Sequence, residues 1–274
     1  MSVGATGGAA GLGSTGSTTA GSGVPGNIGG AAAWGGPLLL VGAGGLAREV
    51  LAVAAEAGRP VRGVLDDRYA DLPPTLGGFP VLGPVGEAAD HPDAELLLCI
   101  GPSTTRAAVH DRLVRSRRQR GRDPHGTGPY GGGTPGDGPH GGHLRFGTVV
   151  DPAVRNPAGC PVGEGSVLLA GVTITADARV GAHVVAMPGV TLTHDCVVGD
   201  FATLAAGVSL GGGVRVGRAA YLGMNSSVRP GVRIGAGAVV GMGAVVLADV
   251  PDGETWAGVP ARALAPRAAV GERR

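Results

Sequence analysis

The sequence predicts a small α/β domain followed by a parallel β-helix. Strand and helix patterns alternate over about 80 residues after Pro37. From Val149 onward the chain then repeats in units of six residues. Glycine makes up 55 of the 274 residues and aromatic residues only 3%, which is typical of disordered sequence or of a fold that turns very often. We expect both in this chain.

The first domain is predicted from short apolar runs, typical of buried strands, that alternate with segments of helical apolar spacing. Leu38–Val41 is a short apolar run ended by glycines, as expected of a strand buried on both faces. Residues 46–57 carry apolar side chains at helical spacing, and Val61–Leu65 and Glu95–Ile100 are predicted strands. Ser103 is a suitable N-cap for a second helix. This order predicts a parallel sheet of the dinucleotide-binding type.

The second domain is read from seventeen uninterrupted six-residue units, Val149 to Val250. The second position of the unit is Val, Ile or Leu in fifteen of them, failing only at Asn156 and Ala186. The sixth position is always Ala, Val, Ser or Cys. One large and one small inward side chain per short strand suits a narrow prism of stacked coils, with glycines at corners that need positive φ. The period itself does not give the hand of the helix.

Bulk properties bound the remaining possibilities. The net charge of +1 favours neither nucleic acid nor a membrane surface as a partner, and no apolar run approaches the roughly 18–20 residues that span a bilayer. Three widely spaced cysteines indicate a reducing compartment, so we expect a cytoplasmic protein. The expected divisions are a disordered tail over 1–36, the α/β domain over 37–118, a Gly/Pro-rich flexible insertion over 119–146, the β-helix over 147–264 and a C-terminal tail over 265–274.

One unit of the repeat carries a candidate acid–base pair. In Thr191–Cys196 the inward positions are Leu192 and Cys196, so His194 should point outward near a corner with Asp195 beside it. An outward histidine can exchange a proton near neutral pH, and a neighbouring carboxylate can fix its tautomer. Spacing alone favours two ordinary surface residues. His183 is the only other histidine of the repeat, so no metal site is expected there, nor at the scattered histidines 125, 140 and 143.

The run from THDCVVGDFATLAAGVSLGGGV through WAGVPAR resembles the sugar acetyltransferases of the sialic-acid O-acetyltransferase, bacillosamine and perosamine N-acetyltransferase type, and the likeness extends over residues 38–264. The resemblance implies a left-handed β-helix, homotrimers with active sites between subunits, and acetyl-CoA as co-substrate. It makes His194 the general base and Asp195 its partner. The residues that it implies near the cofactor are Thr203, Gly212, Met224, Met242 and Gly258.

Three positions depart from that family. Thr203 stands where some members have a second histidine, Met187 where members often have asparagine, and Leu46 where a histidine is frequent in the first loop. A threonine can donate a hydrogen bond to a thioester carbonyl, but it supplies no charge. We expect acetyl transfer to survive these changes.

The glycine-rich loop of residues 42–47 lies between a predicted strand and helix, where backbone amides can approach a phosphate. With Asp66 and Asp67 about twenty residues on, the same loop also fits an NAD-binding site. In the family that the chain resembles, this region binds a sugar or nucleotide-sugar acceptor. The implied acceptor-binding residues are Gly44, Gly45, Leu46, Asp66, Asp67, Gly101 and Arg106.

The function expected from the sequence is therefore direct transfer of an acetyl group from acetyl-CoA to an amine or hydroxyl of a sugar. Backbone amides near Gly212 would stabilise the oxyanion. Two alternatives stay open: a non-catalytic scaffold that binds a nucleotide sugar, and an NAD-dependent enzyme with a β-helical oligomerisation domain. The sequence does not identify the acceptor.

Overall fold

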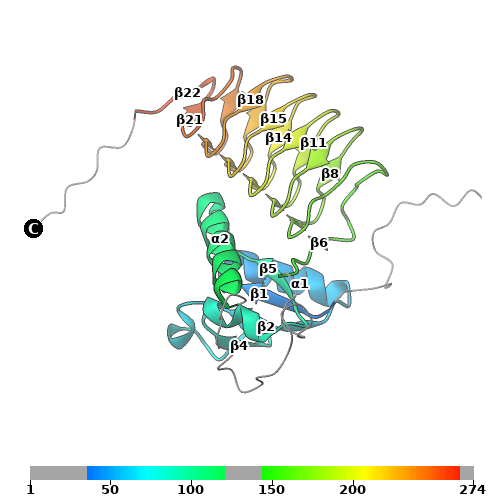
Figure 1. The fold of residues 1–274 in the computed structure, drawn as a ribbon. Coiled ribbons are helices and arrows are strands. Elements are labelled where there is room, and N and C mark those ends of the chain that lie inside the picture. Colours follow the sequence, from blue (N-terminus) through cyan, green and yellow to red (C-terminus); the bar gives the residue numbers. More distant parts are fainter. Residues whose placement is uncertain (1–35, 121–143, 266–274) are drawn as a thin grey trace, which may run out of the picture.

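The computed structural model describes residues 36–120 and 144–265. The predicted tails lie outside the described residues except for their innermost positions, as does most of the predicted insertion, including the histidines 125, 140 and 143. The described chain forms an α/β domain and a long prism of coils, with α2 lying between the two (Figure 1).

The α/β domain has a five-stranded sheet in the order β3-β4-β2-β1-β5. All pairs are parallel except β3 with β4. Its elements are β1 (Leu38–Val41), α1 (Gly45–Glu56), β2 (Val61–Leu65), η1 (Tyr69–Asp71), β3 (Thr75–Leu76), β4 (Phe79–Gly83), η2 (Val85–Asp90), β5 (Glu95–Leu98) and α2 (Ser103–Arg120). Both predicted helices and the three predicted strands are present. The short pair β3 and β4 was not anticipated, because Pro and Gly interrupt its sequence.

Alternate residues of β1 face opposite sides of this sheet and join two separate cores. Leu38 and Leu40 pack with α1, and this cluster continues into Val167 and Val185 of the coils. Leu39 and Val41 pack with residues of η2 and α2 in a cluster that reaches Phe201. The two domains therefore share apolar cores on both sides of the sheet.

The second domain is the expected left-handed parallel β-helix. Its two-residue strands are β6 (Val149–Val150), β7 (Val167–Leu168), β8 (Thr173–Ile174), β9 (Arg179–Val180), β10 (Val185–Ala186), β11 (Thr191–Leu192), β12 (Val197–Val198), β13 (Thr203–Leu204), β14 (Ser209–Leu210), β15 (Arg215–Val216), β16 (Tyr221–Leu222), β17 (Ser227–Val228), β18 (Arg233–Ile234), β19 (Val239–Val240) and β20 (Val245–Val246). The antiparallel pair β21 (Thr255–Gly258) and β22 (Ala261–Ala263) closes it.

Each strand pairs with the strand eighteen residues further on, as Thr191 pairs with Ser209. One coil is thus three six-residue units, and the prism has three faces. Face 1 carries β6, β7, β10, β13, β16 and β19; face 2 carries β8, β11, β14, β17 and β20; face 3 carries β9, β12, β15 and β18. The chain runs from face 1 to face 2 to face 3 in every coil.

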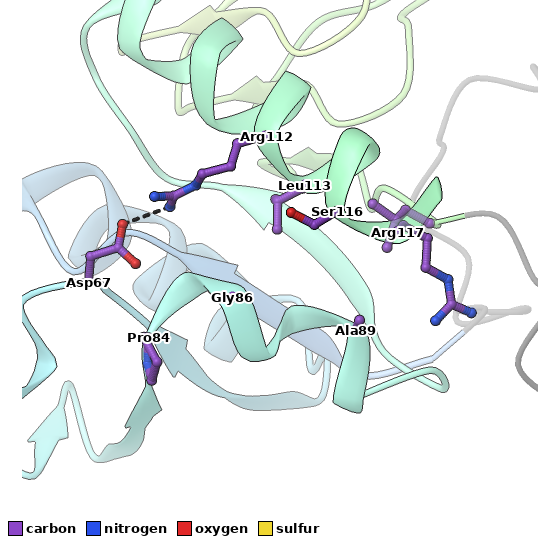
Figure 2. Close-up of a pocket in the computed structure, with 9 residues that line it drawn as sticks. Asp67, Pro84, Gly86, Ala89, Arg112, Leu113, Ser116 and Arg117 are labelled. Atoms are coloured by element: carbon purple, nitrogen blue, oxygen red, sulfur yellow. Dashed lines mark hydrogen bonds and ion pairs between the residues drawn. The ribbon is translucent and has the colours of Figure 1, made fainter. Parts of the chain in front are cut away.

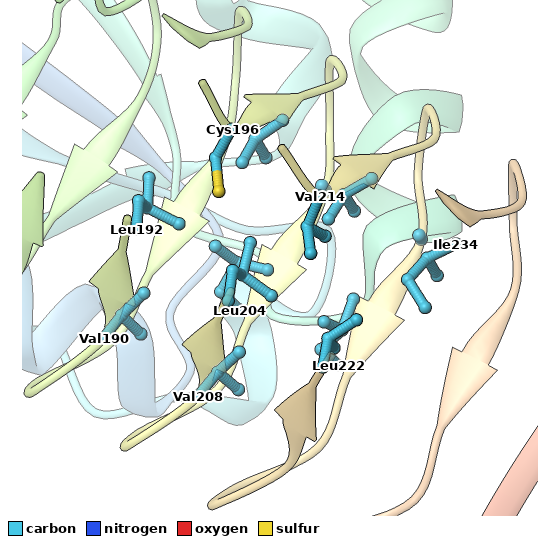
Figure 3. Close-up of a cluster of buried hydrophobic side chains, with 14 of the residues drawn as sticks. Val190, Leu192, Cys196, Leu204, Val208, Val214, Leu222 and Ile234 are labelled. Carbon is cyan, nitrogen blue, oxygen red and sulfur yellow. The ribbon is translucent and has the colours of Figure 1, made fainter. Parts of the chain in front are cut away.

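The second and sixth positions of the units fill the prism, as the repeat predicts. Leu192, Leu204 and Leu222 stack in successive layers beside the smaller Cys196 and Val214 (Figure 3). Cys99, Cys160 and Cys196 are all buried and free, so the two cysteines of the repeat serve as small core residues.

The corners depend on the fifth position of each unit, which has a positive φ from Gly159 to Gly243. Most of these residues are Gly, Asp or Asn, which tolerate this conformation. His183, Phe201 and Ala219 are the exceptions, with φ of 55°, 60° and 54°. All three follow strands of face 3 and precede strands of face 1. We call these three residues the junction corner, since they meet the α/β domain.

Candidate active site

The His194 side chain projects from the corner between faces 2 and 3, where the sequence placed it. Its side chain is 68% exposed and that of Asp195 is 65% exposed. His194 Nδ1 lies 2.8 Å from Asp195 Oδ2. Asp195 takes the left-handed corner conformation with φ 61°, which turns its carboxylate back toward the imidazole. When Nδ1–H donates a hydrogen bond to Asp195, Nε2 carries no hydrogen and is the nitrogen that can take a proton.

Gly212 occupies the same corner one coil later and lies directly against the imidazole. A Cβ at Gly212 would stand 2.4 Å from both Cε1 and Nε2 of His194, so only glycine leaves room for this ring. Neighbouring Gly211 and Gly213 donate their amides to Val228 and His194 carbonyls. The amide of Gly212 makes no hydrogen bond to another described residue. The corner thus combines a free ring nitrogen with an unused N–H donor.

A cavity of about 770 Å³ lies between the α/β domain and face 1. It brings together Gly44, Gly45, Leu46 and Gly101 from one domain with Thr203 and Met224 from the other, all of them predicted site residues. Sequence reasoning missed several further lining residues: Glu49, Ser103, Thr104, Met187 and Tyr221 among them. Tyr221 could have been suspected, because it stands in the outward first position of its unit on the same face as Thr203.

Two helices begin at this cavity. Gly44 is the N-cap of α1, and α2 begins at Ser103. A Cβ at Gly44 would meet no other atom within 4 Å, so the loop backbone is open to the cavity. Helix N-termini present unsatisfied amides and a partial positive charge, which favour a phosphate or another anion.

The two acidic residues predicted to bind the acceptor lie outside this cavity. Asp66 Oδ2 accepts the amide of Ala43 at 2.8 Å and its Oδ1 accepts that of Arg68, so Asp66 holds the loop between β1 and α1. Asp67 lines a smaller pocket of about 300 Å³ beside α2 and η2, where its carboxylate is 2.7 Å from Arg112 Nη2 (Figure 2). Its other oxygen accepts the amide of Val85.

Arg106 is completely buried and lies behind the cavity wall. Its guanidinium donates to Thr203 Oγ1 at 2.9 Å and to backbone carbonyls of both domains. Burial lowers the pKa of Arg106 to about 10. A direct contact with a sugar, which the sequence led us to expect, would require this network to open.

The remaining predicted cofactor residues lie near the C-terminal end of the β-helix. Met224 and Met242 hold equivalent positions in successive coils at the corner between faces 1 and 2, and the Met242 residue is 72% exposed. Gly258 is exposed in β21 with φ 98°. In a single chain these residues lie on a different corner of the prism from His194 and Gly212.

Two surveys of the described residues gave negative findings. Residues 36–120 and 144–265 contain no group of three or more His, Cys, Asp or Glu side chains placed to hold a metal ion. No helix in this part of the chain is long and apolar enough to span a membrane.

Two family models match the chain. Residues 37–113 match the PglD N-terminal domain, and residues 213–248 match the bacterial transferase hexapeptide (six repeats). A search of curated protein sequences finds no match.

Solved structures similar to this one cover nearly the whole described fold. PerB from Caulobacter crescentus, in complex with CoA and GDP-perosamine, is 29% identical with a TM-score of 0.69, over 84% of this chain and 98% of that one. The acetyltransferase domain of PglB from Neisseria gonorrhoeae, in complex with acetyl coenzyme A, is 25% identical with a TM-score of 0.69 over 83% and 98%. WeeI from Acinetobacter baumannii is 25% identical with a TM-score of 0.64 over 83% and 99%.

The resemblance read from the sequence is therefore confirmed in both domains. The chain combines a PglD-type N-terminal domain with hexapeptide repeats, and it is similar in sequence and fold to sugar acetyltransferases built in the same way.

Proposed function

We propose that this acyltransferase transfers the acetyl group of acetyl-CoA to an amine or hydroxyl of a nucleotide-linked sugar, with His194 as general base. The observation that carries this proposal is the exposed His194–Asp195 pair lying against Gly212. The similarity to PerB and to the PglB domain, whose structures hold CoA, GDP-perosamine or acetyl coenzyme A, supports the choice of substrates.

The proposed reaction is a direct transfer. The acceptor nitrogen or oxygen attacks the thioester carbonyl carbon, and His194 Nε2 takes the proton that the acceptor loses. The carbonyl oxygen becomes an oxyanion, to which the amide of Gly212 can donate, since it makes no hydrogen bond to another described residue. The intermediate then collapses, the carbon–sulfur bond breaks, and the CoA thiolate takes the proton from the His194 imidazolium, which restores the base. Asp195 accepts the Nδ1 hydrogen bond and stabilises the imidazolium that forms.

We place the acceptor in the cavity between the α/β domain and face 1. Its volume suits a small ligand. The N-termini of α1 and α2 meet there, so their amides would hold the phosphates of a nucleotide sugar. The uncharged Ser103, Thr104 and Tyr221 can hydrogen-bond its hydroxyl groups.

The active site needs more than one copy of the chain. His194 projects from the corner between faces 2 and 3, whereas the cavity opens on face 1, the opposite side of a three-sided prism. A single copy therefore keeps its own base away from its own acceptor. We propose a homotrimer in which the His194 corner of one subunit approaches the cavity of the next, as the family resemblance implies. The free, buried state of all three cysteines fits the reducing cytoplasm that the sequence led us to expect.

The test is a calorimetric titration of the purified protein with acetyl-CoA, with NAD in parallel. Micromolar binding of acetyl-CoA without a response to NAD, followed by acetylation of a GDP- or UDP-linked amino sugar, is the expected result. A folded trimer that binds neither acetyl-CoA nor NAD would be a scaffold. Binding of NAD alone would favour the dehydrogenase alternative for the glycine loop.

A further inference from the structure

The junction between the two domains contains a buried cation without a carboxylate partner. Arg106 has no exposed surface, and none of its hydrogen bonds within the described residues goes to an acidic side chain. It also lies in the first turn of α2, where the helix dipole disfavours a positive charge. Burying a charge in such surroundings is unfavourable unless many polar contacts compensate for the lost water.

Those contacts all lie at the meeting of the two domains. Within the α/β domain, Nη1 donates to the carbonyls of Ile100 and Gly101 at 2.6 and 3.0 Å. Toward the β-helix, Nε donates to the carbonyl of His183 at 3.0 Å, and Nη2 donates to those of Phe201 and Ala202 at 2.8 and 3.0 Å. One guanidinium group therefore connects the loop before α2 with two successive coils.

Two of the carbonyls that accept these bonds, those of His183 and Phe201, belong to the junction corner. His183 and Phe201 adopt the left-handed conformation without being glycine, which is an unfavourable state for a bulky residue. Their rings stack 4.7 Å apart and pack with His110 of α2 and with Phe146. Strain at the corner thus coincides with the contacts that hold α2 in place.

The same network reaches the cavity wall. Thr203 Oγ1 lies 2.9 Å from Arg106 Nη2, 2.9 Å from Ser103 Oγ and 3.0 Å from the carbonyl of Gly101. Ser103, Gly101 and Thr203 line the cavity, and Arg106 stands immediately behind them. Gly101 and Ser103 belong to one wall and Thr203 to the other, so the relative position of the two walls depends on this cluster.

We propose that Arg106 is a positioning residue of the acceptor site, which fixes the distance between the two cavity walls by tying the start of α2 to β13 and the junction corner. This inference rests on the proposed function for its kinetic part. It assigns Arg106 an indirect role in place of a sugar contact. Because His194 and Gly212 lie on another corner of the prism, the placement of the general base should not depend on Arg106.

The experiment compares Arg106→Gln and Arg106→Lys with Arg115→Gln, a variant of an exposed arginine on the same helix. With GDP-perosamine as acceptor probe, we expect Arg106→Gln to raise the KM for the acceptor about ten-fold or more, with kcat within about three-fold. Arg106→Lys should recover part of the loss, and Arg115→Gln should match the wild type. A kcat that falls while KM stays constant, or a KM equal to that of the wild type, would overturn the proposal.

Amide hydrogen exchange separates this inference from the proposed function and covers a variant with altered folding. In Arg106→Gln we expect faster exchange in α2 and around residues 199–205, with unchanged protection in the coils after residue 227. Exchange that is unchanged in α2, or raised equally in all coils, contradicts a positioning role. If the wild-type protein fails to acetylate any nucleotide sugar, the proposed function falls while the exchange experiment still decides the role of Arg106.

Discussion

The corner that carries His183 and the corner that carries His194 lie in successive coils, and in both a histidine is placed at or beside a left-handed residue. His194 is solvent-exposed, pairs with a carboxylate and lies over a glycine with a free amide. His183 is 3% exposed, lies among three other rings, and its Nδ1 is buried without a hydrogen-bond partner. His183 is itself the left-handed residue of its corner, whereas His194 precedes the left-handed Asp195. The chemistry of a histidine in this fold is therefore decided by its position in the unit and by what packs against its corner.

The largest effect is expected at the exposed corner. His194→Ala should lower kcat by about 10²–10⁴-fold, because it removes the group that takes the acceptor's proton. The affinity for acetyl-CoA should change little, as measured by calorimetry, which separates loss of the base from loss of the fold. His183→Phe is the matched variant at the other corner, and it should keep most of the activity. Full turnover by His194→Ala would remove the histidine from the mechanism.

The second prediction concerns the residue beneath the imidazole. A methyl group at Gly212 would stand 2.4 Å from the ring, so Gly212→Ala must displace His194. Misplacing a catalytic group by about 1 Å can lower the rate on the order of 10²-fold, and we expect a loss of that size in kcat. Gly86→Ala is a suitable control, because a Cβ there meets no atom within 4 Å. Wild-type kcat in the Gly212 variant would mean that the ring does not act from this position.

The third prediction concerns the buried corner and acidic pH. Burial, with help from His110, Arg106 and Arg218, lowers the pKa of His183 from 6.5 to about 4, while Asp200 opposes the shift. Below pH 6.5 the unfolded state therefore binds more protons than the folded state. The unfolding free energy keeps the full contribution of neutral His183 above pH 6.5 and loses it as the pH falls toward 4. At about 1.4 kcal/mol per pKa unit, a shift of this size corresponds to roughly 3 kcal/mol.

Urea unfolding at several pH values measures this effect. Between pH 7 and pH 4.5 the wild-type protein should lose more unfolding free energy than His183→Phe, which keeps a ring at the corner but cannot be protonated. If the unfolding free energies of the two proteins depend on pH in the same way, His183 takes up no net proton on unfolding and this prediction is wrong.

The smallest effect is expected for the partner of the base. Asp195→Asn keeps a residue that tolerates positive φ, and it removes the negative charge that stabilises the imidazolium. Since both side chains are largely exposed, water screens this interaction, and we expect kcat to fall only about ten-fold. Steady-state kinetics of the two proteins at the same pH measure this effect. A kcat equal to that of the wild type would separate Asp195 from the base.

The sequence contained the repeat register and the outward position of His194, because both follow from a period of six that every unit obeys. It also contained the β-strands and helices of the first domain, whose apolar spacing is local. The domain junction could not be read in this way. Arg106 was expected to contact the acceptor, and only the packing of α2 against the coils makes it a buried donor between the domains.

One signal of the junction was nevertheless present in the sequence. His183, Phe201 and Ala219 replace the usual Gly, Asp or Asn of the fifth position at intervals of eighteen residues, which marks one edge of the prism. The cavity is less accessible to sequence reasoning, because its lining comes from two domains whose relative placement no local pattern specifies.

Each strand pairs with the one eighteen residues further on. The number of residues between two positions therefore decides which face or corner of the prism each occupies. Adding a whole coil of eighteen residues after Val228 would lengthen the prism and leave every side chain on its original face. Adding a single unit of six between His183 and His194 would turn everything beyond it by one third of a revolution, carrying His194 to a different edge. Natural or engineered changes in coil number should therefore come in multiples of three units, whereas the distance in sequence between the domain junction and the base is held to one value.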